Sequence, residues 1–340
     1  MASIVARVYR NQMVESVHYG DWVIVDHEGR IIAWQGDPHL RTFIRSAAKP
    51  IQAVPIVTEG AADRFRLTDS ELAVICSSHS GEPEHLAAVS SILAKIGLDH
   101  KALRCGVHPP RDPQQQQLLI RTGAEPNELH NNCSGKHAGM LALCVHKGWD
   151  LNTYTDPGHP LQQMILSYIS EFCGASADTI SLGIDGCGVP VFGLALVEMA
   201  LAWARLADPS RFSPQWAVAV EWITLSMRRH PNLVAGSNRL CTDLMRAFRP
   251  CGLVAKAGAE AVYCIALPDR GWGLALKIAD GSSRAIAPVV LAILSRLGYS
   301  GDRKILSQYQ PAVIYNHHRQ PVGEIVPDLS EAIFERVVHQ

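Results

Sequence analysis

The chain has 340 residues, of which 47% are apolar and 19% are charged, and its formal net charge is −1. This apolar fraction can form a sizeable core and excludes a disordered chain. A net charge near zero argues against a nucleic-acid surface or a polyanionic partner. No apolar run is long enough to span a bilayer, so we expect no membrane association.

Cysteine usage and the first residues point to a cellular compartment. The nine cysteines are scattered and odd in number, which favours reduced thiols over a disulfide framework. Residues 1–7 lack the apolar run and cleavage site of a signal peptide. Both features predict a cytoplasmic protein.

The first 36 residues have the pattern of β-strands. Residues 22–26 and 31–35 are rich in Val, Ile and Trp, and they flank a four-residue loop at 27–30. This arrangement predicts a β-hairpin. The Asp-Pro pair at 37–38 ends the strand pattern.

A Ser-x-x-Lys motif follows, formed by Ser46 and Lys49. Residues three apart on a helical turn lie on one face, so the hydroxyl and the amine can meet. Serine becomes a good nucleophile when a base takes its proton. Lysine can be that base when burial or a neighbouring cation, here Arg45, lowers its pKa. Taken alone, the motif is weak evidence for catalysis, and a solvated helix start is the more common case.

The motif should open a helix. Pro50 disfavours helical geometry in the preceding residue, so we expect a tight turn and then a mostly apolar helix ending near Gly60. Pro55 should kink this helix or end it early. Residues 69–72 have the composition of another helix N-terminus.

A second polar segment spans residues 77–85. Its hydroxyl side chains, Gly and Pro predict a loop. Glu82 and His85 can cap the helix that we expect from Leu86 to Ile96. A capped loop without catalytic function is the alternative. The Pro-rich and Gln-rich residues 105–117 then predict a surface connection that could act as a lid.

The third polar segment, residues 131–140, is Gly-rich and opens a helix that we expect over 138–146. Backbone N–H groups at such a position can hold an anion or an oxyanion, although the spacing is not that of a P-loop. Cys133, Lys136 and His137 are also possible metal ligands. A buried cysteine beside a helix start is the more common case.

A fourth polar segment, residues 184–190, consists mainly of turn-forming and ligand-type residues, and an apolar helix should follow it to about Leu206. The rest of the middle should be mostly helical, and the last third returns to strands. We expect helices at 160–172, 214–229, 241–248 and 285–297, a loop at 230–236, and strands at 254–260, 262–267 and 272–278.

Strands at both ends and helices between them predict an α+β protein with an antiparallel sheet flanked by helices and a helical lobe. Residues 1–60 and 250–300 would contribute the sheet lobe, and residues 65–250 the helical lobe, of a single domain over 1–340. A cleft between the lobes would collect the polar segments and Lys256.

In their order and joint presence, these motifs resemble the Rhizobium etli-type L-asparaginases. The matching segments are residues 45–50, 77–82, 133–137, 185–190, 230–236 and 256–260. The resemblance covers most of the chain. It implies a serine β-lactamase-like and glutaminase-like fold, L-asparagine amidohydrolase activity, a homodimer and a zinc ion near the active site.

The resemblance also implies roles for individual residues. The catalytic residues would be Ser46 as nucleophile, Lys49 as its base, and a second Ser–Lys pair formed by Ser78 and Lys256. Ser78 is assigned within a run of similar residues at 77–80. The implied zinc ligands are Cys133, Lys136 and Cys187. The implied substrate-binding residues are Arg45, His137 and Asp185.

The implied zinc site has unusual chemistry. Two thiolates are strong zinc ligands, but Cys133 and Cys187 lie far apart in the sequence, so only folding can bring them together. Lysine is an uncommon ligand because its amine must be neutral to bind. With water in the fourth position, such a complex could be a substrate-side electrophile or a structural clamp.

Three alternatives compete with an asparaginase that works through an acyl-enzyme. A glutaminase has the same chemistry, and one methylene in a pocket changes specificity by about 1–3 kcal/mol. A penicillin-recognising hydrolase or transpeptidase shares Ser-x-x-Lys but normally works outside the cytoplasm. A non-catalytic zinc-binding or ligand-sensing protein of this fold is the third alternative, and two Ser–Lys pairs count against it.

Overall fold

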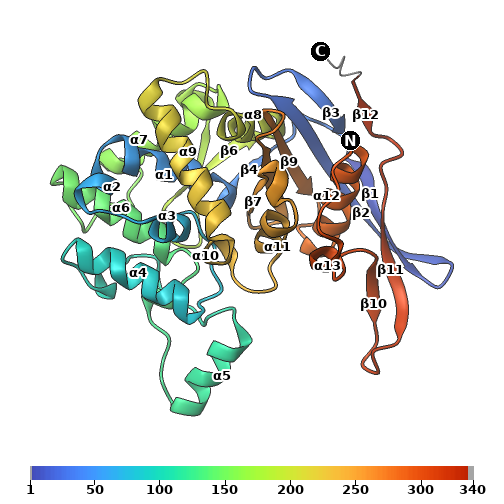
Figure 1. Ribbon diagram of the computed structural model, residues 1–340, viewed down its shortest axis with the longest axis horizontal. Coiled ribbons are helices and arrows are strands. Elements are labelled where there is room, and N and C mark those ends of the chain that lie inside the picture. The colour runs from blue at the N-terminus through green and yellow to red at the C-terminus, as the bar shows by residue number, and fades with distance from the viewer. Residues whose placement is uncertain (1, 336–340) are drawn as a thin grey trace. The chain divides into compact units, whose positions relative to one another are not determined.

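The computed structural model describes residues 2–335, and its chain divides into two compact units (Figure 1). The sheet unit takes in Met1–Thr42, Leu194–Asp208 and Asp243–Gln340, and the helical unit takes in Phe43–Gly193 and Pro209–Thr242. Residues 43–60, expected with the sheet, therefore belong to the helical unit. Residues 194–208, expected with the helices, belong to the sheet unit.

The sheet unit is built on an antiparallel sheet of order β10-β11-β1-β2-β9-β8-β7, in which β3 pairs with β2 and with β12. The hairpin expected at 22–35 is confirmed, with Val23 opposite Trp34. Both ends of the chain meet in the sheet, with Arg7 opposite Val326. The strands are β1 (Ser3–Arg10), β2 (Met13–Asp26), β3 (Ile31–Gln35), β7 (Val254–Ala257), β8 (Val262–Leu267), β9 (Trp272–Ile278), β10 (Ala312–Tyr315), β11 (Pro321–Pro327) and β12 (Ile333–Phe334).

Helices cover this sheet. α8 (Leu196–Ala207) packs against β2, β8 and β9, and α12 (Ile286–Arg296) packs against β1 and β11. Every residue of β8 is buried, since the strand lies between β9 and β7 and packs against α8. The predicted α+β class with an antiparallel sheet is therefore confirmed. The shorter helices α11 (Leu240–Ala247) and α13 (Arg303–Leu306) complete this part of the chain.

The helical unit contains most of the helices, both predicted and unpredicted. They are α1 (Lys49–Thr58), α2 (Ala61–Arg64), α3 (Asp69–Ile75), α4 (Pro83–Lys95), α5 (Pro113–Thr122), α6 (Ser134–Lys147), α7 (Pro160–Cys173), α9 (Pro214–Arg229) and α10 (Pro231–Ala235). α1 continues past Pro55, and α10 occupies a segment that was expected to be a loop. Within residues 2–335, every helix is too short or too polar to cross a membrane.

Two of these helices begin as the sequence indicates. Thr68 and Glu71 form a capping box at the start of α3. Glu82 and His85 form another at the start of α4, where the Glu82 amide donates to Nδ1 of His85 at 3.1 Å. The predicted cap at residues 82–85 is confirmed, although α4 begins three residues before Leu86.

The third polar segment is part of a helix rather than a loop before it. α6 begins at Ser134, four residues earlier than expected. Gly135 suggested a loop, but its role is packing, because a Cβ there would lie 2.1 Å from the Val74 carbonyl oxygen. The close approach of α6 to α3 therefore requires glycine at this position.

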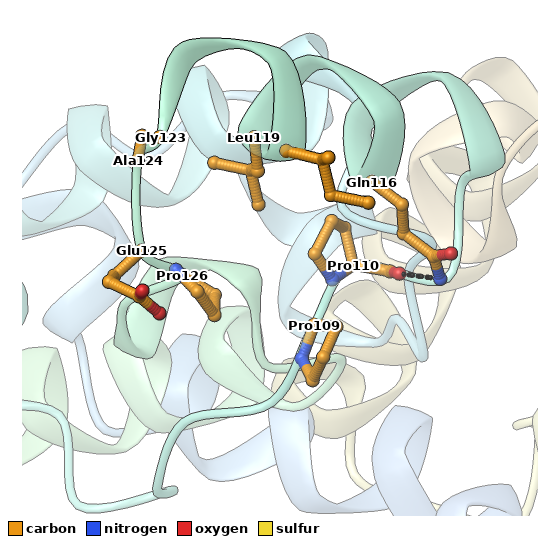
Figure 2. A pocket seen from close by; sticks show the side chains of 9 residues that line it. Pro109, Pro110, Gln116, Leu119, Gly123, Ala124, Glu125 and Pro126 are labelled. Atoms are coloured by element: carbon orange, nitrogen blue, oxygen red, sulfur yellow. Dashed lines mark hydrogen bonds between the residues drawn. The ribbon is translucent and has the colours of Figure 1, made fainter.

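Several further elements were missed. Residues 105–117 are not a continuous loop, because α5 begins at Pro113 with Asp112 as its N-cap. Figure 2 shows α5 beside Pro109 and Pro110, where the Gln116 side chain donates to the Pro110 carbonyl at 2.6 Å. The fourth polar segment connects two strands, β5 (Ser181–Ile184) and β6 (Pro190–Ala195). The short strand β4 spans Arg41–Phe43.

Candidate active site

Ser46 lies in a tight turn that leads directly into α1, as predicted. The turn is a 3-10 helix over Arg45–Ala48. Arg45 has a φ of 52°, a left-handed conformation that is uncommon outside glycine and often marks functional sites. Its guanidinium bonds Oδ1 of Asp185 through Nε at 3.1 Å and Nη2 at 2.8 Å. This ion pair joins the Ser46 turn to the loop after β5.

Lys49 is the most connected polar side chain of the site and is only 1% exposed. Its amine donates to the Ser77 carbonyl at 2.5 Å, to Ser78 Oγ at 3.1 Å and to Cys133 Sγ at 3.1 Å. Three acceptors on two separate segments thus satisfy the three donors of a buried ammonium group.

The contact expected between Lys49 and Ser46 is not formed in this conformation. Across residues 2–335, the Lys49 amine makes its hydrogen bonds to the acceptors named above and none to the Ser46 hydroxyl. Ser46 is half-buried, one turn earlier. The three-residue spacing allows a contact between Ser46 and Lys49, but the Lys49 amine is bonded to the buried acceptors instead.

Lys136 and two cysteines form a second polar group. The Lys136 amine lies 3.0 Å from Cys187 Sγ. The hydrogen bond from the Cys133 thiol lowers the pKa of Cys187 to about 4 against the effect of burial, with further help from the Lys136 charge. Burial disfavours the charged amine of Lys136, but the neighbouring Cys187 and Cys133 sulfurs outweigh it and raise its pKa. The group is therefore an ammonium–thiolate pair with a neutral thiol beside it.

His137 and Asp185 line the edge of this group. His137 is fully buried, with Nδ1 2.7 Å from the Tyr154 hydroxyl. Burial first, and then the Lys136 charge, lowers the pKa of His137 to about 3, so its ring is neutral. Burial would raise the pKa of Asp185, but Lys136 and Arg45 hold it below the usual value. Asp185 is therefore an ionised carboxylate.

Nine of the ten predicted site residues lie in the helical unit. A continuous chain of contacts joins Ser78, Lys49, Cys133, Cys187 and Lys136. The tenth, Lys256, lies on β7 of the sheet unit, where it is 1% exposed and its amine donates to the Ala257 carbonyl at 2.9 Å.

Sequence reasoning missed two residues that support the site. His79 is buried, and its Nε2 lies 2.8 Å from Ser134 Oγ, which ties the second polar segment to the first turn of α6. Tyr154 bonds His137 and also accepts from the Arg104 amide at 2.8 Å. His79 stood within a recognised polar run, whereas nothing in the sequence around Tyr154 indicated its role.

The implied zinc ligands can be tested against this geometry. In the described part of the chain, no three His, Cys, Asp or Glu side chains gather closely enough to hold a metal ion. A metal here must therefore take a ligand of another type. Lys136 supplies such a ligand, since its amine contacts the sulfur of Cys187. The Cys187 sulfur in turn is hydrogen-bonded to the Cys133 thiol. The donor set fits zinc once the amine and thiol protons are released.

Comparison with known proteins gives a family-level match. The family model described as L-asparaginase II matches residues 6–327. No curated protein sequence matches the chain.

Several solved structures are similar in fold. A putative beta-lactamase from Bacteroides dorei has 12% identity over 81% of this chain and 93% of its own, with a TM-score of 0.44. An octameric penicillin-binding protein homologue from Pyrococcus abyssi has 13% identity over 83% and 74%, with a TM-score of 0.45. Mglu has 14% identity over 87% and 65%, with a TM-score of 0.38.

Proposed function

The chain belongs to the L-asparaginase II family, and on this premise we propose that it hydrolyses L-asparagine to L-aspartate and ammonia through an acyl-enzyme. The family makes it an asparaginase-type amidohydrolase. The observation that supports a serine mechanism is the buried Lys49 amine, 3.1 Å from Ser78 Oγ and one helical turn after Ser46. A lysine in such a position can take a serine proton.

In this proposal Ser46 is the nucleophile and Lys49 is its base. Ser46 is half-buried and so keeps access to a substrate, whereas Ser78 is 9% exposed and already bonded to Lys49. In this proposal the lysine side chain rotates and brings its amine, after loss of a proton, to the Ser46 hydroxyl. Lys49 takes the proton as Ser46 Oγ attacks the side-chain amide carbon, and backbone N–H groups of the turn stabilise the oxyanion.

The proton then has to reach the leaving nitrogen. We assign this transfer to Ser78, which already bonds Lys49, and we retain Lys256 as its partner on the family motif alone. The C–N bond breaks as ammonia departs, and a water molecule then hydrolyses the Ser46 ester to release L-aspartate.

The other end of the substrate needs its own contacts. The ionised Asp185 carboxylate suits the α-ammonium group, and Arg45 holds that carboxylate in place. His137 is neutral and buried, so it can act as a hydrogen-bond partner without adding charge. These three residues form the proposed substrate-binding set.

We also propose that Cys133, Lys136 and Cys187 hold one zinc ion. Bound there, zinc would supply positive charge that polarises a carbonyl or clamps the two cysteines. The double variant Cys133→Ser with Cys187→Ser should purify without stoichiometric zinc. Metal analysis showing unchanged zinc in that variant would refute the ligand set.

Ammonia release from L-asparagine and L-glutamine, assayed on metal-free and zinc-loaded protein, tests the activity. We expect fast release from L-asparagine and little from L-glutamine. Ser46→Ala should lower turnover by about 10³-fold or more while leaving the fold intact, and the exposed Ser167→Ala is the matched control. Full activity in Ser46→Ala with loss in Ser78→Ala would move the nucleophile to Ser78. No ammonia release from either substrate would refute the proposed activity.

Compartment and assembly remain proposals of the same kind. The nine cysteines all lie within residues 2–335, and none of them forms a disulfide there, which supports a reducing compartment such as the cytoplasm. The homodimer follows from the family resemblance, and light scattering at several protein concentrations measures it directly.

A further inference from the structure

A polar cavity of about 490 Å³ lies in the helical unit, outside the set of residues assigned so far. Three segments line it: the polar loop that follows Ser78, the residues before α5, and the loop after α10. Two arginines, Arg111 and Arg239, contribute its positive charge.

Neither arginine has a counter-ion in the described part of the chain. Within residues 2–335, neither guanidinium lies within ion-pair distance of a carboxylate, and neither makes a hydrogen bond. Arg111 is exposed to solvent as a whole residue, but partial loss of water around its guanidinium, followed by the positive charge of Arg239, lowers its pKa. Two like charges on one cavity repel each other, and an anion placed between them would relieve that repulsion.

The carboxylates of the cavity have other partners. Glu82 accepts hydrogen bonds from the Ser237 amide at 2.6 Å and from the Asn232 side chain at 3.2 Å. Asp112 accepts from the Gln115 amide at 2.9 Å as the N-cap of α5. These carboxylates satisfy donors of the loops themselves, so they hold the cavity wall and leave the arginines available.

Gly236 fixes the loop that carries Arg239. Its φ of 118° is in a region that side chains avoid, and a Cβ there would lie 2.6 Å from Glu82 Oε1 and 2.7 Å from Ser80 Oγ. The backbone is therefore pressed against the second polar segment, which a larger residue would prevent. The position of the cavity wall at Gly236 is therefore set by close packing of the backbone.

The cavity adjoins the proposed reaction centre. Ser80, on its wall, lies two residues after Ser78, and both bond the same segment: the Ser78 amide donates to the Val234 carbonyl at 3.0 Å and Ser80 Oγ donates to the Ala235 carbonyl at 2.9 Å. Arg111 also lies near Cys133. Arg45, in contrast, is already committed to Asp185.

We propose that Arg111 and Arg239 form a carboxylate-binding subsite beside the reaction centre. The fork of a guanidinium matches a carboxylate through two parallel hydrogen bonds. Its occupant rests on the proposed function: it is the α-carboxylate of L-asparagine and of the L-aspartate product. A small carboxylate that binds separately from the substrate is the other source of the same chemistry.

Calorimetric titration with L-aspartate and with succinate tests the subsite without turnover. Each of Arg111→Gln and Arg239→Gln should weaken binding of both ligands about 10-fold, which corresponds to about 1.4 kcal/mol. Arg111→Lys keeps the charge but loses the fork, and it should show a smaller loss. The matched control is Arg121→Gln, an exposed arginine in the last turn of α5, which should bind as the wild type does.

Steady-state assays separate the two sources of carboxylate. If the subsite holds the α-carboxylate, the arginine variants should raise KM for L-asparagine with kcat within about threefold. The same variants should then leave kcat/KM unchanged for L-asparaginamide, which lacks the carboxylate. If a separate carboxylate binds there, KM should stay constant and succinate should bind alongside L-asparagine without competing.

Several outcomes would overturn the subsite. Equal affinities for L-aspartate and succinate in wild type and both Gln variants, with circular dichroism showing intact folds, would do so. So would the absence of binding by either ligand at millimolar concentration. Arginine-dependent binding without any ammonia release would refute the proposed activity alone. Ammonia release with arginine-independent binding would refute the subsite alone.

Discussion

Two buried lysines of the helical unit show how a partner decides what a lysine can do. Lys49 and Lys136 are 1% and 3% exposed, and each amine lies within about 3.1 Å of a cysteine sulfur. Lys136 faces the Cys187 thiolate, which keeps the amine charged. Lys49 contacts a carbonyl, a hydroxyl and the Cys133 sulfur. The hydrogen bond to Cys187 and then burial raise the pKa of the Cys133 thiol to about 11.

The different contact partners of the two lysines fit different proposed roles. In the proposed mechanism Lys49 is the general base, whereas Lys136 is proposed to hold sulfur or metal. Burial alone does not separate them.

The largest expected effect comes from removing the base. Lys49→Met should lower kcat/KM for L-asparagine by about 10³-fold, at the upper part of the range for a positioned acid–base group. Ammonia release measures this, with the exposed Lys101→Met as control. A variant that keeps more than a tenth of wild-type activity would break the comparison, because Lys49 would then be only a structural donor.

The next effect concerns Lys136. Lys136→Met removes the proposed amine ligand and should weaken zinc binding by at least about 100-fold, the upper end of what outer-shell substitutions cost. Competition with a chelator of known affinity measures the change. Wild-type zinc affinity in this variant would show that the amine only pairs with the thiolate.

An ion pair between Lys95 and Glu71 shows what a lysine contact with a buried carboxylate contributes to stability alone, and so serves as a reference for Lys49 and Lys136. Lys95 lies 2.6 Å from the carboxylate of buried Glu71. Burial raises the pKa of Glu71, but Lys95, the Thr68 amide and Ser91 together bring it below its usual value. Since the folded pKa is the lower one, this stabilisation is present above the unfolded pKa and is lost as pH falls through the folded pKa.

Glu71→Gln should therefore lower the free energy of unfolding by about 1–2 kcal/mol at pH 7. The difference from wild type should shrink as pH falls below about 4, near the unfolded pKa of glutamate. Urea unfolding of both proteins at pH 7 and at about pH 3.5 measures it. A difference that grows toward low pH would contradict the assigned sign.

The smallest effect tests a neighbour of the Lys136 group. Tyr154→Phe removes the hydroxyl that bonds His137 and the Arg104 amide. It should cost about 1 kcal/mol of stability and leave both lysine contacts in place. Denaturant unfolding measures the first, and zinc content with ammonia release checks the second. A large loss of activity would give Tyr154 a part in the chemistry.

Much of the sheet could be predicted from local patterns. The Val-rich and Ile-rich hairpin at 22–35 and the cap at Glu82 depend on neighbouring residues, and both appear in the structure. The strand β6 could not be told from a helix start, because a short apolar run has no diagnostic period. The start of α6 was misplaced because Gly135 serves a packing contact that depends on α3.

In the candidate site, too, local motifs could be recognised in the sequence, whereas contacts between distant segments could not. Motif order supplied the ten candidate residues, and nine of them lie in one unit of the fold. The partner of Lys49 could not be read from spacing, since a long side chain selects among acceptors that only the fold assembles. Arg111 and Arg239 belong to separate segments without a common motif, so no sequence signal joined them.

The pairing of β1 with β11 has a consequence for the order of events during synthesis. The helical unit is complete once Thr242 has left the ribosome, whereas the sheet needs residues up to Phe334 and β1 needs those up to Pro327. Because chains emerge N-terminus first, the contacts of Lys49 can assemble while β1 still lacks one of its partners. The growing chain therefore carries an open strand edge for much of its synthesis, and such edges favour aggregation until they are covered.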